Sequence, residues 1–300
     1  MSETLDLLPQ HPAEAVLQSL LSAYQLRAHV TDRFEACGEW NEPAPDAPFA
    51  WFHLVQEGVC TIRSSSLPVP LRMSAGDLVV FPGGAAHHLC SAPTSADETV
   101  DARVMMICGE FHFDGPVAAP LLRALPSAIT VRAHADGGQL AALAAVLRNE
   151  AERQAFGSRA VLDKLSDALF VIALREYLRD KPPTHGLLAA LTEPRLSAAL
   201  AAIHQNPGSH WTVQSLADKA LLSRAVFAQR FNELLGETPM RYLLRWRMTE
   251  ALLRLREGRS SVAHVAGELG FETEAAFRRA FKRIHGFGPG LARREARRTP

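Results

Sequence analysis

The chain has 300 residues, of which 47% are hydrophobic and 21% charged, a composition typical of about two soluble globular domains. No apolar run approaches the roughly 18 residues of a membrane span, and the first residues lack the basic and apolar regions of a secretion signal. We therefore expect a cytoplasmic protein that does not enter a membrane. The four cysteines (Cys37, Cys60, Cys90 and Cys108) lack CxxC spacing and are too few for a disulfide scaffold, so we expect free thiols.

The formal net charge is zero, but charge is unevenly distributed along the chain. Residues 191–300 contain 18 Lys and Arg against 10 Asp and Glu, whereas the remaining 190 residues contain 14 against 22. A basic half beside an acidic one is typical of a protein that binds a polyanion through one half, although many solvated surfaces carry as much charge.

The first part of the chain contains helical and strand patterns in turn. Apolar residues recur at helical spacing over 12–24. Short apolar runs separated by Gly, Pro and Ser then extend from about 25 to 132, which predicts an all-β sandwich or barrel. The runs that we assign to strands are 50–55, 60–62, 77–81, 104–108 and 129–131. Two further helical stripes over 139–178 end at Asp180-Lys-Pro-Pro-Thr, which is typical of an interdomain linker.

In the last third of the chain, a short helix, a turn and a longer helix occur twice. The segment 212–220 leads to a helix predicted at 224–235, and the segment 261–270 leads to a helix predicted at 274–285. Ser or Thr precedes each longer helix as an N-cap, and Gly270 lies where such a turn favours positive φ. This is the helix-turn-helix pattern, whose second helix enters the major groove of DNA.

Two features connect and anchor the repeated units. Phenylalanines four residues apart should fix each longer helix to its core; they are Phe227 with Phe231 and Phe277 with Phe281. The intervening segment 239–255 opens with Pro and is predicted to be a connecting helix of about 25 Å.

These motifs resemble the two-unit DNA-binding domain of the AraC/XylS family, and the segment Gly270–Lys282, with the pattern GFx5FxRxFK, is its most specific part. The resemblance implies a sequence-specific transcription regulator that binds a double-stranded DNA operator as a homodimer. It also implies contact with RNA polymerase if the protein is an activator.

The resemblance, together with helical geometry, assigns residues that contact DNA. The exposed faces of the two longer helices are predicted to carry Arg224, Ala225, Ala228 and Gln229 in the first and Glu274, Ala275, Arg278 and Arg279 in the second. Ala can contact the thymine methyl group, Gln can pair with adenine, and Arg is the usual reader of guanine. Phosphate contacts are predicted for Lys282, Arg283, Arg241, Arg245 and Arg247. The alternative is that these side chains form a solvated helical face.

The segment Gly76–His87 has the spacing Gx5PxGx2H and resembles the second motif of the cupin barrels. Only the end of the first cupin motif is present, because its paired histidines and following glutamate are missing. His53, His87 and His112 are candidate ligands of one zinc, copper or nickel ion in the barrel. The alternative is that His53 and His87 are hydrogen-bonded interior histidines. We expect His88 to face away from His87, because neighbours in a strand alternate.

The combination of this cupin type with an AraC-type tail resembles a subgroup that includes hypochlorite-responsive regulators. The similar segments are Cys37-Gly-Glu-Trp, Phe52-His53, Ala86-His87 and Ile107-Cys108-Gly109. The resemblance implies oxidant sensing by Cys37 and Cys108, in which a sulfenic acid formed on one thiol is captured by the other. Cys60 is predicted to be a buried apolar residue, and Cys90 is a further candidate ligand or redox thiol.

We therefore predict a multidomain protein, an all-β cupin barrel followed by a helical hairpin and an all-α double helix-turn-helix domain. The sensor domain is predicted over 1–135, the dimerising hairpin with its linker over 136–188, and the DNA-binding domain over 189–300. Two other functions stay open: a regulator with an organic effector or metal ion in the barrel, and a metal-dependent cupin enzyme fused to the DNA-binding domain. The missing glutamate near His53 disfavours the enzyme, and we assign no catalytic residue.

Overall fold

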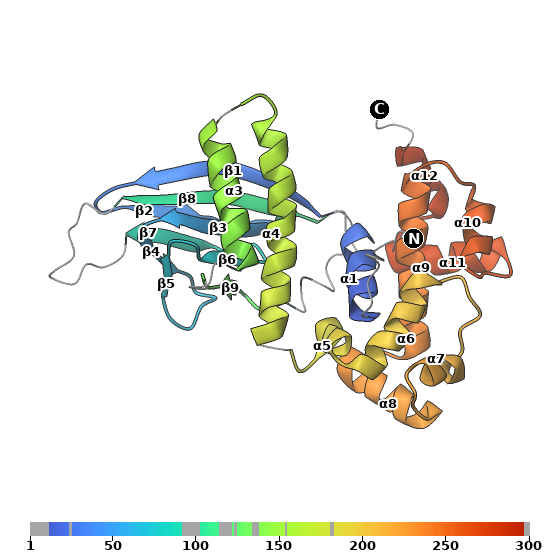
Figure 1. Ribbon diagram of the computed structural model, residues 1–300. Helices are drawn as coiled ribbons and strands as arrows, with labels where there is room; N and C mark the ends of the chain where they lie inside the picture. Colours follow the sequence, from blue (N-terminus) through green and yellow to red (C-terminus); the bar gives the residue numbers. More distant parts are fainter. Residues whose placement is uncertain are drawn as a thin grey trace, which may run out of the picture. The chain divides into compact units, whose positions relative to one another are not determined.

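The computed structural model describes residues 12–23, 26–91, 103–113, 122, 125–133, 138–153, 155–180 and 183–296 (Figure 1). The chain divides into two compact units. Strands β1 to β9 with helices α3 and α4 form the β unit, and α1 with α5 to α12 forms the helical unit. Among the described residues no single helix is long and apolar enough to cross a membrane; only the bent pair α5 and α6, taken together, passes by length and composition.

The β unit contains two antiparallel sheets. The sheet with the order β1-β8-β3-β6-β9 consists of β1 (Arg27–Ala36), β3 (Ala50–Glu57), β6 (Leu78–Phe81), β8 (Val104–His112) and β9 (Ile129–Val131). The sheet with the order β2-β7-β4-β5 consists of β2 (Asn41–Ala44), β4 (Val59–Arg63), β5 (Leu71–Ser74) and β7 (His87–Ser91). The predicted all-β domain is confirmed.

Inward-facing side chains from both sheets form the core of the β unit. They are Val55, Cys60, Ile62, Met73, Val79, Phe81, Leu89, Val104, Met106 and Cys108. Cys60 is fully buried, as predicted. Gly84 in the turn before β7 has φ +66°, and a Cβ there would overlap the carbonyl oxygen of Ala47. The turn therefore requires glycine, which explains the spacing that places His87 at the start of β7.

Helices α3 (Gln139–Arg153) and α4 (Ser158–Asp180) are the predicted hairpin, and they lie along the five-stranded sheet (Figure 1). Two carboxylates of α4 accept hydrogen bonds from the backbone of the edge strand β1. Asp167 accepts from the N–H of Ala28 at 2.7 Å, and Asp163 accepts from the N–H of Val30 at 3.0 Å. Because an edge strand otherwise leaves such donors unpaired, these carboxylates fasten the hairpin to the sheet.

The helical unit contains nine described helices: α1 (Pro12–Ala23), α5 (Gly186–Thr192), α6 (Pro194–Gln205), α7 (Val213–Lys219), α8 (Arg224–Leu235), α9 (Pro239–Arg256), α10 (Val262–Glu268), α11 (Glu274–His285) and α12 (Pro289–Ala296). Helix α1 packs on α6 and buries Val16, Leu20 and Ala23. The sequence prediction had placed these residues in the sensor domain. Helical periodicity identifies the apolar stripe of α1 but not the surface that covers it.

Candidate nucleic-acid interface and sensor interior

The two helix-turn-helix pairs, α7–α8 and α10–α11, turn through a left-handed residue at the same place. Leu221 has φ 54° and Gly270 has φ 74°, which confirms the conformation predicted for Gly270. A Cβ at Gly270 would overlap the carbonyl oxygen of Gly208, so the second turn requires glycine. The first turn accommodates leucine because the Leu221 side chain is 84% exposed.

Helices α8 and α11 begin and pack as predicted. The hydroxyl of Ser223 accepts from the backbone N–H of Val226 at 3.4 Å, and the hydroxyl of Thr273 accepts from that of Ala276 at 3.2 Å. Both N-caps are thus present. The buried faces carry the predicted phenylalanine pairs, which are fully buried: Phe227, Phe231, Phe277 and Phe281. Since these residues fix one face of each helix in the core, the opposite face is turned to solvent.

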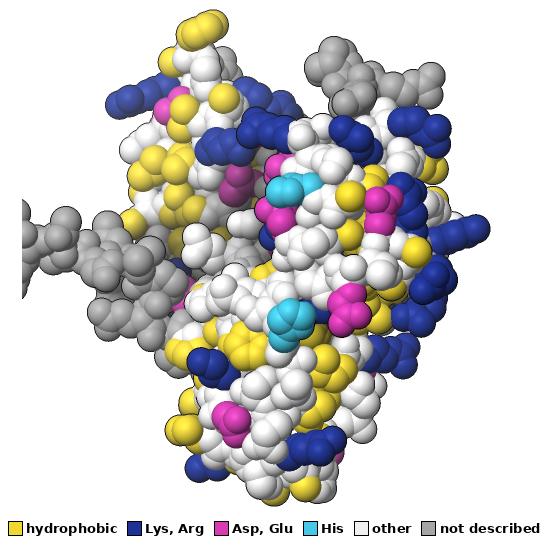
Figure 2. Space-filling model, turned by 90° about the vertical axis from the view of Figure 1, so that its right-hand side faces the viewer, with side chains coloured by type: hydrophobic (Ala, Val, Ile, Leu, Met, Phe, Trp, Pro, Cys, Tyr) yellow, Lys and Arg dark blue, Asp and Glu magenta, His cyan; other side chains and the backbone are white. Residues whose placement is uncertain are grey.

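The predicted DNA-contacting residues lie on the outer faces of α8 and α11. The exposed residues are Arg224, Ala225, Gln229, Ala275, Arg278, Arg279, Lys282 and Arg283; Ala228 and Glu274 are partly buried. Arg278 donates to Glu274 at 2.6 Å, and Gln229 donates to Glu233 at 2.8 Å. Figure 2 shows Lys and Arg side chains gathered along the right-hand edge of the face drawn.

Two arginines of the connecting helix α9 are already occupied. Arg247 donates to the carbonyl oxygens of Pro207 and Ser209 at 2.7 and 2.8 Å, which ties α9 to the loop after α6. Arg245 donates to Glu237 at 2.6 Å. The phosphate contact predicted for Arg245 would require that ion pair to open. The phosphate contact predicted for Arg247 would break both carbonyl hydrogen bonds and detach the loop after α6. Helical spacing indicates the position of Arg247 on the helix but not these carbonyl partners.

In the β unit, Cys108, His53 and His87 form a chain of hydrogen bonds inside the core. His53 Nδ1 lies 3.1 Å from Cys108 Sγ, and His53 Nε2 lies 2.7 Å from His87 Nε2. His87 Nδ1 lies 2.8 Å from the carbonyl oxygen of Ala85. A carbonyl only accepts, so His87 carries its proton on Nδ1. Neutral His87 then accepts at Nε2 from His53, and neutral His53 accepts at Nδ1 from the Cys108 thiol.

Burial holds every member of this chain in its neutral form. Burial, and to a smaller extent the positive charge that His87 would carry, together lower the pKa of His53 to about 3. Burial also lowers the pKa of His87 and raises that of the Cys108 thiol. A cysteine beside a histidine is often an activated thiolate, but here desolvation opposes both the thiolate and the imidazolium. Cys108 is therefore an interior hydrogen-bond donor.

The third predicted metal ligand lies elsewhere. His112 is half-exposed, and its Nε2 pairs with Glu110 at 2.7 Å. No group of three His, Cys, Asp or Glu side chains is placed to hold a metal ion among the described residues. His53 and His87 supply two nitrogens, whereas a structural or catalytic zinc has three or four protein ligands. The three histidines of the predicted set are therefore not brought together. His112 lies at the C-terminal end of β8, four residues beyond Cys108, and pairs with Glu110 of the same strand.

The structure also separates the predicted redox partners. Cys37 is exposed and follows Ala36, which pairs with Val104. Val104 precedes Cys108 by four residues of β8, or about 14 Å at the rise of an antiparallel strand. A disulfide needs Cα atoms within about 7 Å, so a Cys37–Cys108 bond would require β1 to leave the sheet. The predicted strand 104–108 would end at Cys108, but β8 continues to His112, so Cys108 lies inside the strand and not at its end.

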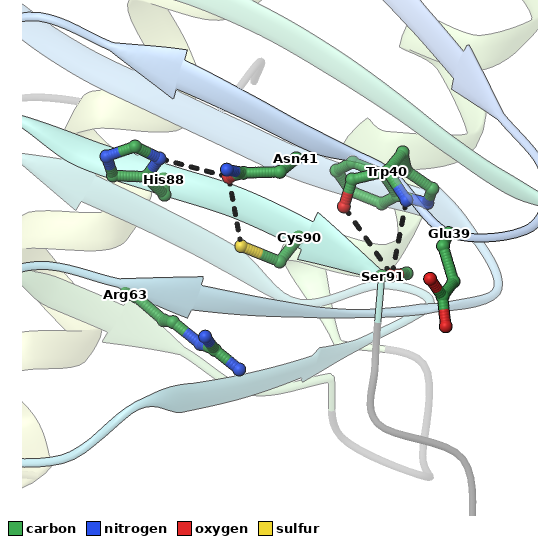
Figure 3. A pocket seen from close by; sticks show the side chains of 7 residues that line it. All are labelled: Glu39, Trp40, Asn41, Arg63, His88, Cys90 and Ser91. Atoms are coloured by element: carbon green, nitrogen blue, oxygen red, sulfur yellow. Dashed lines mark hydrogen bonds between the residues drawn. The ribbon is translucent and has the colours of Figure 1, made fainter.

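A cavity that the sequence analysis missed lies on the outer face of the four-stranded sheet (Figure 3). It measures about 660 Å³ and is lined by Glu39, Trp40, Asn41, Arg63, His88, Cys90 and Ser91. His87 is buried and His88 is exposed, which confirms that these neighbours face opposite ways. Cys90 is partly exposed here, and its thiol donates to Asn41 at 3.3 Å. Strand alternation from His87 was the signal that could have placed these residues on one face.

Comparisons with known proteins agree with both halves of the chain. Residues 15–179 match the family described as Cupin, and residues 216–295 match the family described as Helix-turn-helix domain. A putative AraC-like transcription regulator of Streptomyces lividans is 31% identical over 91% of this chain and 96% of its own length. The transcriptional regulator AlkR of Acinetobacter baylyi is 30% identical over 82% of this chain and 88% of its own.

The chain is also similar to a transcriptional activator of Escherichia coli and to a solved DNA-binding domain in complex with DNA. The RCS-specific transcriptional activator RclR of Escherichia coli is 26% identical over 86% of this chain and 90% of its own length. Among solved structures, the DNA-binding domain of AdpA in complex with a target DNA is 32% identical. It covers 35% of this chain and 96% of its own, with a TM-score of 0.33.

Proposed function

This chain belongs to the AraC family of transcription regulators that carry an N-terminal cupin domain, and from that premise we propose that a signal received by the β unit controls binding of both helix-turn-helix pairs to an operator. DNA binding and transcription regulation are common to this family. The observation that carries the proposal is the duplication of a capped recognition helix, α8 and α11, each anchored by two buried phenylalanines and exposed on its outer face.

Arg279 is the proposed principal base-reading residue of α11. It is exposed and has no hydrogen-bond or ion-pair partner among the described residues, so it can reach a base edge without breaking a contact. Arg278 must first leave Glu274. Lys282, one turn further along α11, is proposed to bind a phosphate. On α8, Ala225, Ala228 and Gln229 are the proposed base contacts, as the family resemblance implies.

The test uses the full chain and an operator selected by it from random DNA, with affinities measured by fluorescence anisotropy at several salt concentrations. Arg279→Ala should cost about 1–3 kcal/mol and relax base preference at one position. Lys282→Ala should weaken all sequences alike and reduce the salt dependence. Arg195→Ala, an exposed arginine of α6, is the control. The proposal fails if the full chain selects no sequence, or if Arg279→Ala binds like the control.

A homodimer formed through α3 and α4 is part of the proposal. Val146 on α3 and Val161 on α4 are 50% and 42% exposed, although each helix already buries its other apolar face against the sheet. Light scattering should give a dimer for the parent and a monomer for Val146→Asp combined with Val161→Asp. Arg148→Asp on α3 is the control. If the parent is monomeric at the concentrations that bind DNA, the hairpin is not the dimer contact.

An oxidant is the proposed signal, supported by the similarity to RclR and by two thiols that solvent can reach. Hypochlorous acid would convert a thiol to a sulfenic acid with release of a proton and chloride, and a second thiol would then condense with it to a disulfide with loss of water. The accessible thiols are Cys37 and Cys90, whereas Cys60 and Cys108 are buried. Because Cys108 is buried in β8, we propose Cys90 in its place as the partner of Cys37.

Single Cys→Ser variants of the full chain test this proposal. Oxidant should change DNA binding of the parent, of Cys60→Ser and of Cys108→Ser, and should leave Cys37→Ser and Cys90→Ser unchanged. If Cys37→Ser and Cys90→Ser still respond like the parent, the thiol mechanism fails and an organic effector takes its place. RNA polymerase contact is proposed only for an activator, and transcription in vitro with the selected operator tests it.

Metal binding in the barrel is a second candidate function, and it is supported only by His53 and His87. The two facing nitrogens could hold a transition-metal ion only with ligands from outside the described residues. Elemental analysis of the purified protein should then give about one metal per chain, lost in His87→Ala. If the purified protein contains no metal and chelator does not change its melting temperature, His53 and His87 are interior hydrogen-bonded histidines and not metal ligands.

A further inference from the structure

We propose that the cavity on the outer face of the four-stranded sheet binds a free α-amino acid in its zwitterionic form. This site goes beyond the proposed function, because it lies outside the barrel interior and uses none of the DNA-binding residues. Its size, about 660 Å³, is within the range of small-molecule sites.

The sheet itself assembles the cavity. Residues at alternate positions share a face, so His88 and Cys90 of β7 point outward together. Arg63 of β4 is paired in register with His88, and Asn41 of β2 is paired with Cys90. Three adjacent strands therefore present polar side chains to one space, which Figure 3 shows closed at one side by Trp40 and Glu39 of the β1–β2 turn.

Two opposite charges line this space without neutralising each other. Arg63 and Glu39 are both exposed, and neither has an ion-pair partner within 4.0 Å among the described residues. Both line the cavity, and Figure 3 shows them at different sides of it, Arg63 on β4 and Glu39 beyond Ser91. A guanidinium recognises a carboxylate, and a carboxylate recognises an ammonium group. A ligand that carries both groups would satisfy Arg63 and Glu39 simultaneously, which a simple anion or a simple amine cannot do.

The remaining lining residues supply orientation and an apolar wall. Asn41 Oδ1 accepts from His88 Nδ1 at 3.0 Å and from Cys90 Sγ at 3.3 Å, so its acceptor is used and its amide N–H groups are left to donate. They can join Arg63 in binding a carboxylate. The indole of Trp40 packs on Phe34 with ring centroids 4.9 Å apart, which holds it as a fixed surface for the ligand side chain.

The first measurement is calorimetric titration of the full chain with each of the twenty common L-amino acids, followed by alkylation of Cys90 read by peptide mass spectrometry. At least one amino acid should bind and slow alkylation of Cys90, which locates it in the cavity. The matching deaminated acid and decarboxylated amine should each bind at least tenfold more weakly. Binding by none of the twenty, or equal binding of the amino acid and its two analogues, overturns the proposal.

Variants then assign each charge to its partner. Arg63→Gln should lose the preference for the amino acid over its decarboxylated amine, and Arg63→Lys should keep part of it. Glu39→Gln should lose the preference over the deaminated acid. Arg72→Gln removes the same charge from β5 of the same sheet, outside the cavity lining, and should behave like the parent. Unchanged preferences in Arg63→Gln and Glu39→Gln overturn the assignment. No DNA is present, so failure here leaves the proposed regulator untouched.

Discussion

Replacement of His53 by Gln should remove much of the acid sensitivity of the β unit. His53 is 3% exposed, and burial lowers its pKa from 6.5 to about 3. The unfolded chain therefore takes up a proton at this residue near pH 6.5, whereas the folded chain does not until about pH 3. Above pH 6.5 His53 therefore does not lower the free energy of unfolding. As the pH falls from 6.5 toward 3, protonation of His53 in the unfolded chain lowers it progressively.

The expected size of the effect follows from these two pKa values. Between pH 8 and pH 5 the free energy of unfolding should fall by about 2 kcal/mol on account of His53, and by about 4 kcal/mol once pH 3 is reached. His87, whose pKa is also lowered, adds to the loss in the same direction. Gln keeps one donor and one acceptor for His87 and Cys108 but does not titrate, so the variant should lose only the His53 contribution.

The assay is urea unfolding at pH 8, 7, 6 and 5 with pulsed hydrogen exchange, because mass spectrometry follows peptides of β3 and β8 separately from those of the helical unit. His53→Gln should flatten the pH dependence of the β3 and β8 peptides by about 2 kcal/mol between pH 8 and 5 relative to the parent. A parent-like slope in His53→Gln would refute the neutral buried chain.

Three further outcomes follow from packing and backbone geometry. Gly270→Ala should destabilise the helical unit by more than about 2 kcal/mol in urea unfolding, because left-handed strain adds to the overlap with a backbone carbonyl. Leu221→Gly should be neutral or stabilising by up to about 1 kcal/mol. Equal effects of the two substitutions would contradict the difference between the turns. Asp163→Ala should cost about 1–2 kcal/mol and accelerate exchange of β1 amides, and unchanged exchange would contradict the edge contact. Leu20→Ala should cost about 2–5 kcal/mol and expose α6 rather than β1 to proteolysis, and the reverse pattern would place α1 in the other unit.

Local sequence signals predicted the helical unit well because its determinants are local. The N-cap hydroxyls at Ser223 and Thr273 act within three residues, and the phenylalanine pairs recur at helical spacing, so the predicted 224–235 and 274–285 coincide with α8 and α11. The conformation of Gly270 was predictable for the same reason. The carbonyl partners of Arg247 were not, because they lie about 40 residues away in sequence.

The β unit was predicted in outline only. Strands with continuous apolar burial, such as β6, were evident, whereas β1 and β2 are largely exposed and give no apolar run. Sequence motifs identified His53 and His87, which do meet. They could not show that a neutral Cys108 completes this chain of hydrogen bonds, or that His112 is not part of it. Both facts depend on the register in which β3 pairs with β8, where His53 lies opposite Cys108.

The packing of α1 on α6 has a consequence for synthesis on the ribosome. Helix α1 ends at Ala23, but its partner ends at Gln205, after all the strands of the β unit. At about 5–20 residues per second, α1 waits roughly 10 to 35 s for the surface that covers Val16 and Leu20. The nascent β unit therefore completes its own sheets while an uncovered apolar helix is tethered to it. Closure of this distant contact is a late step, during which the apolar face of α1 is accessible to chaperones and proteases.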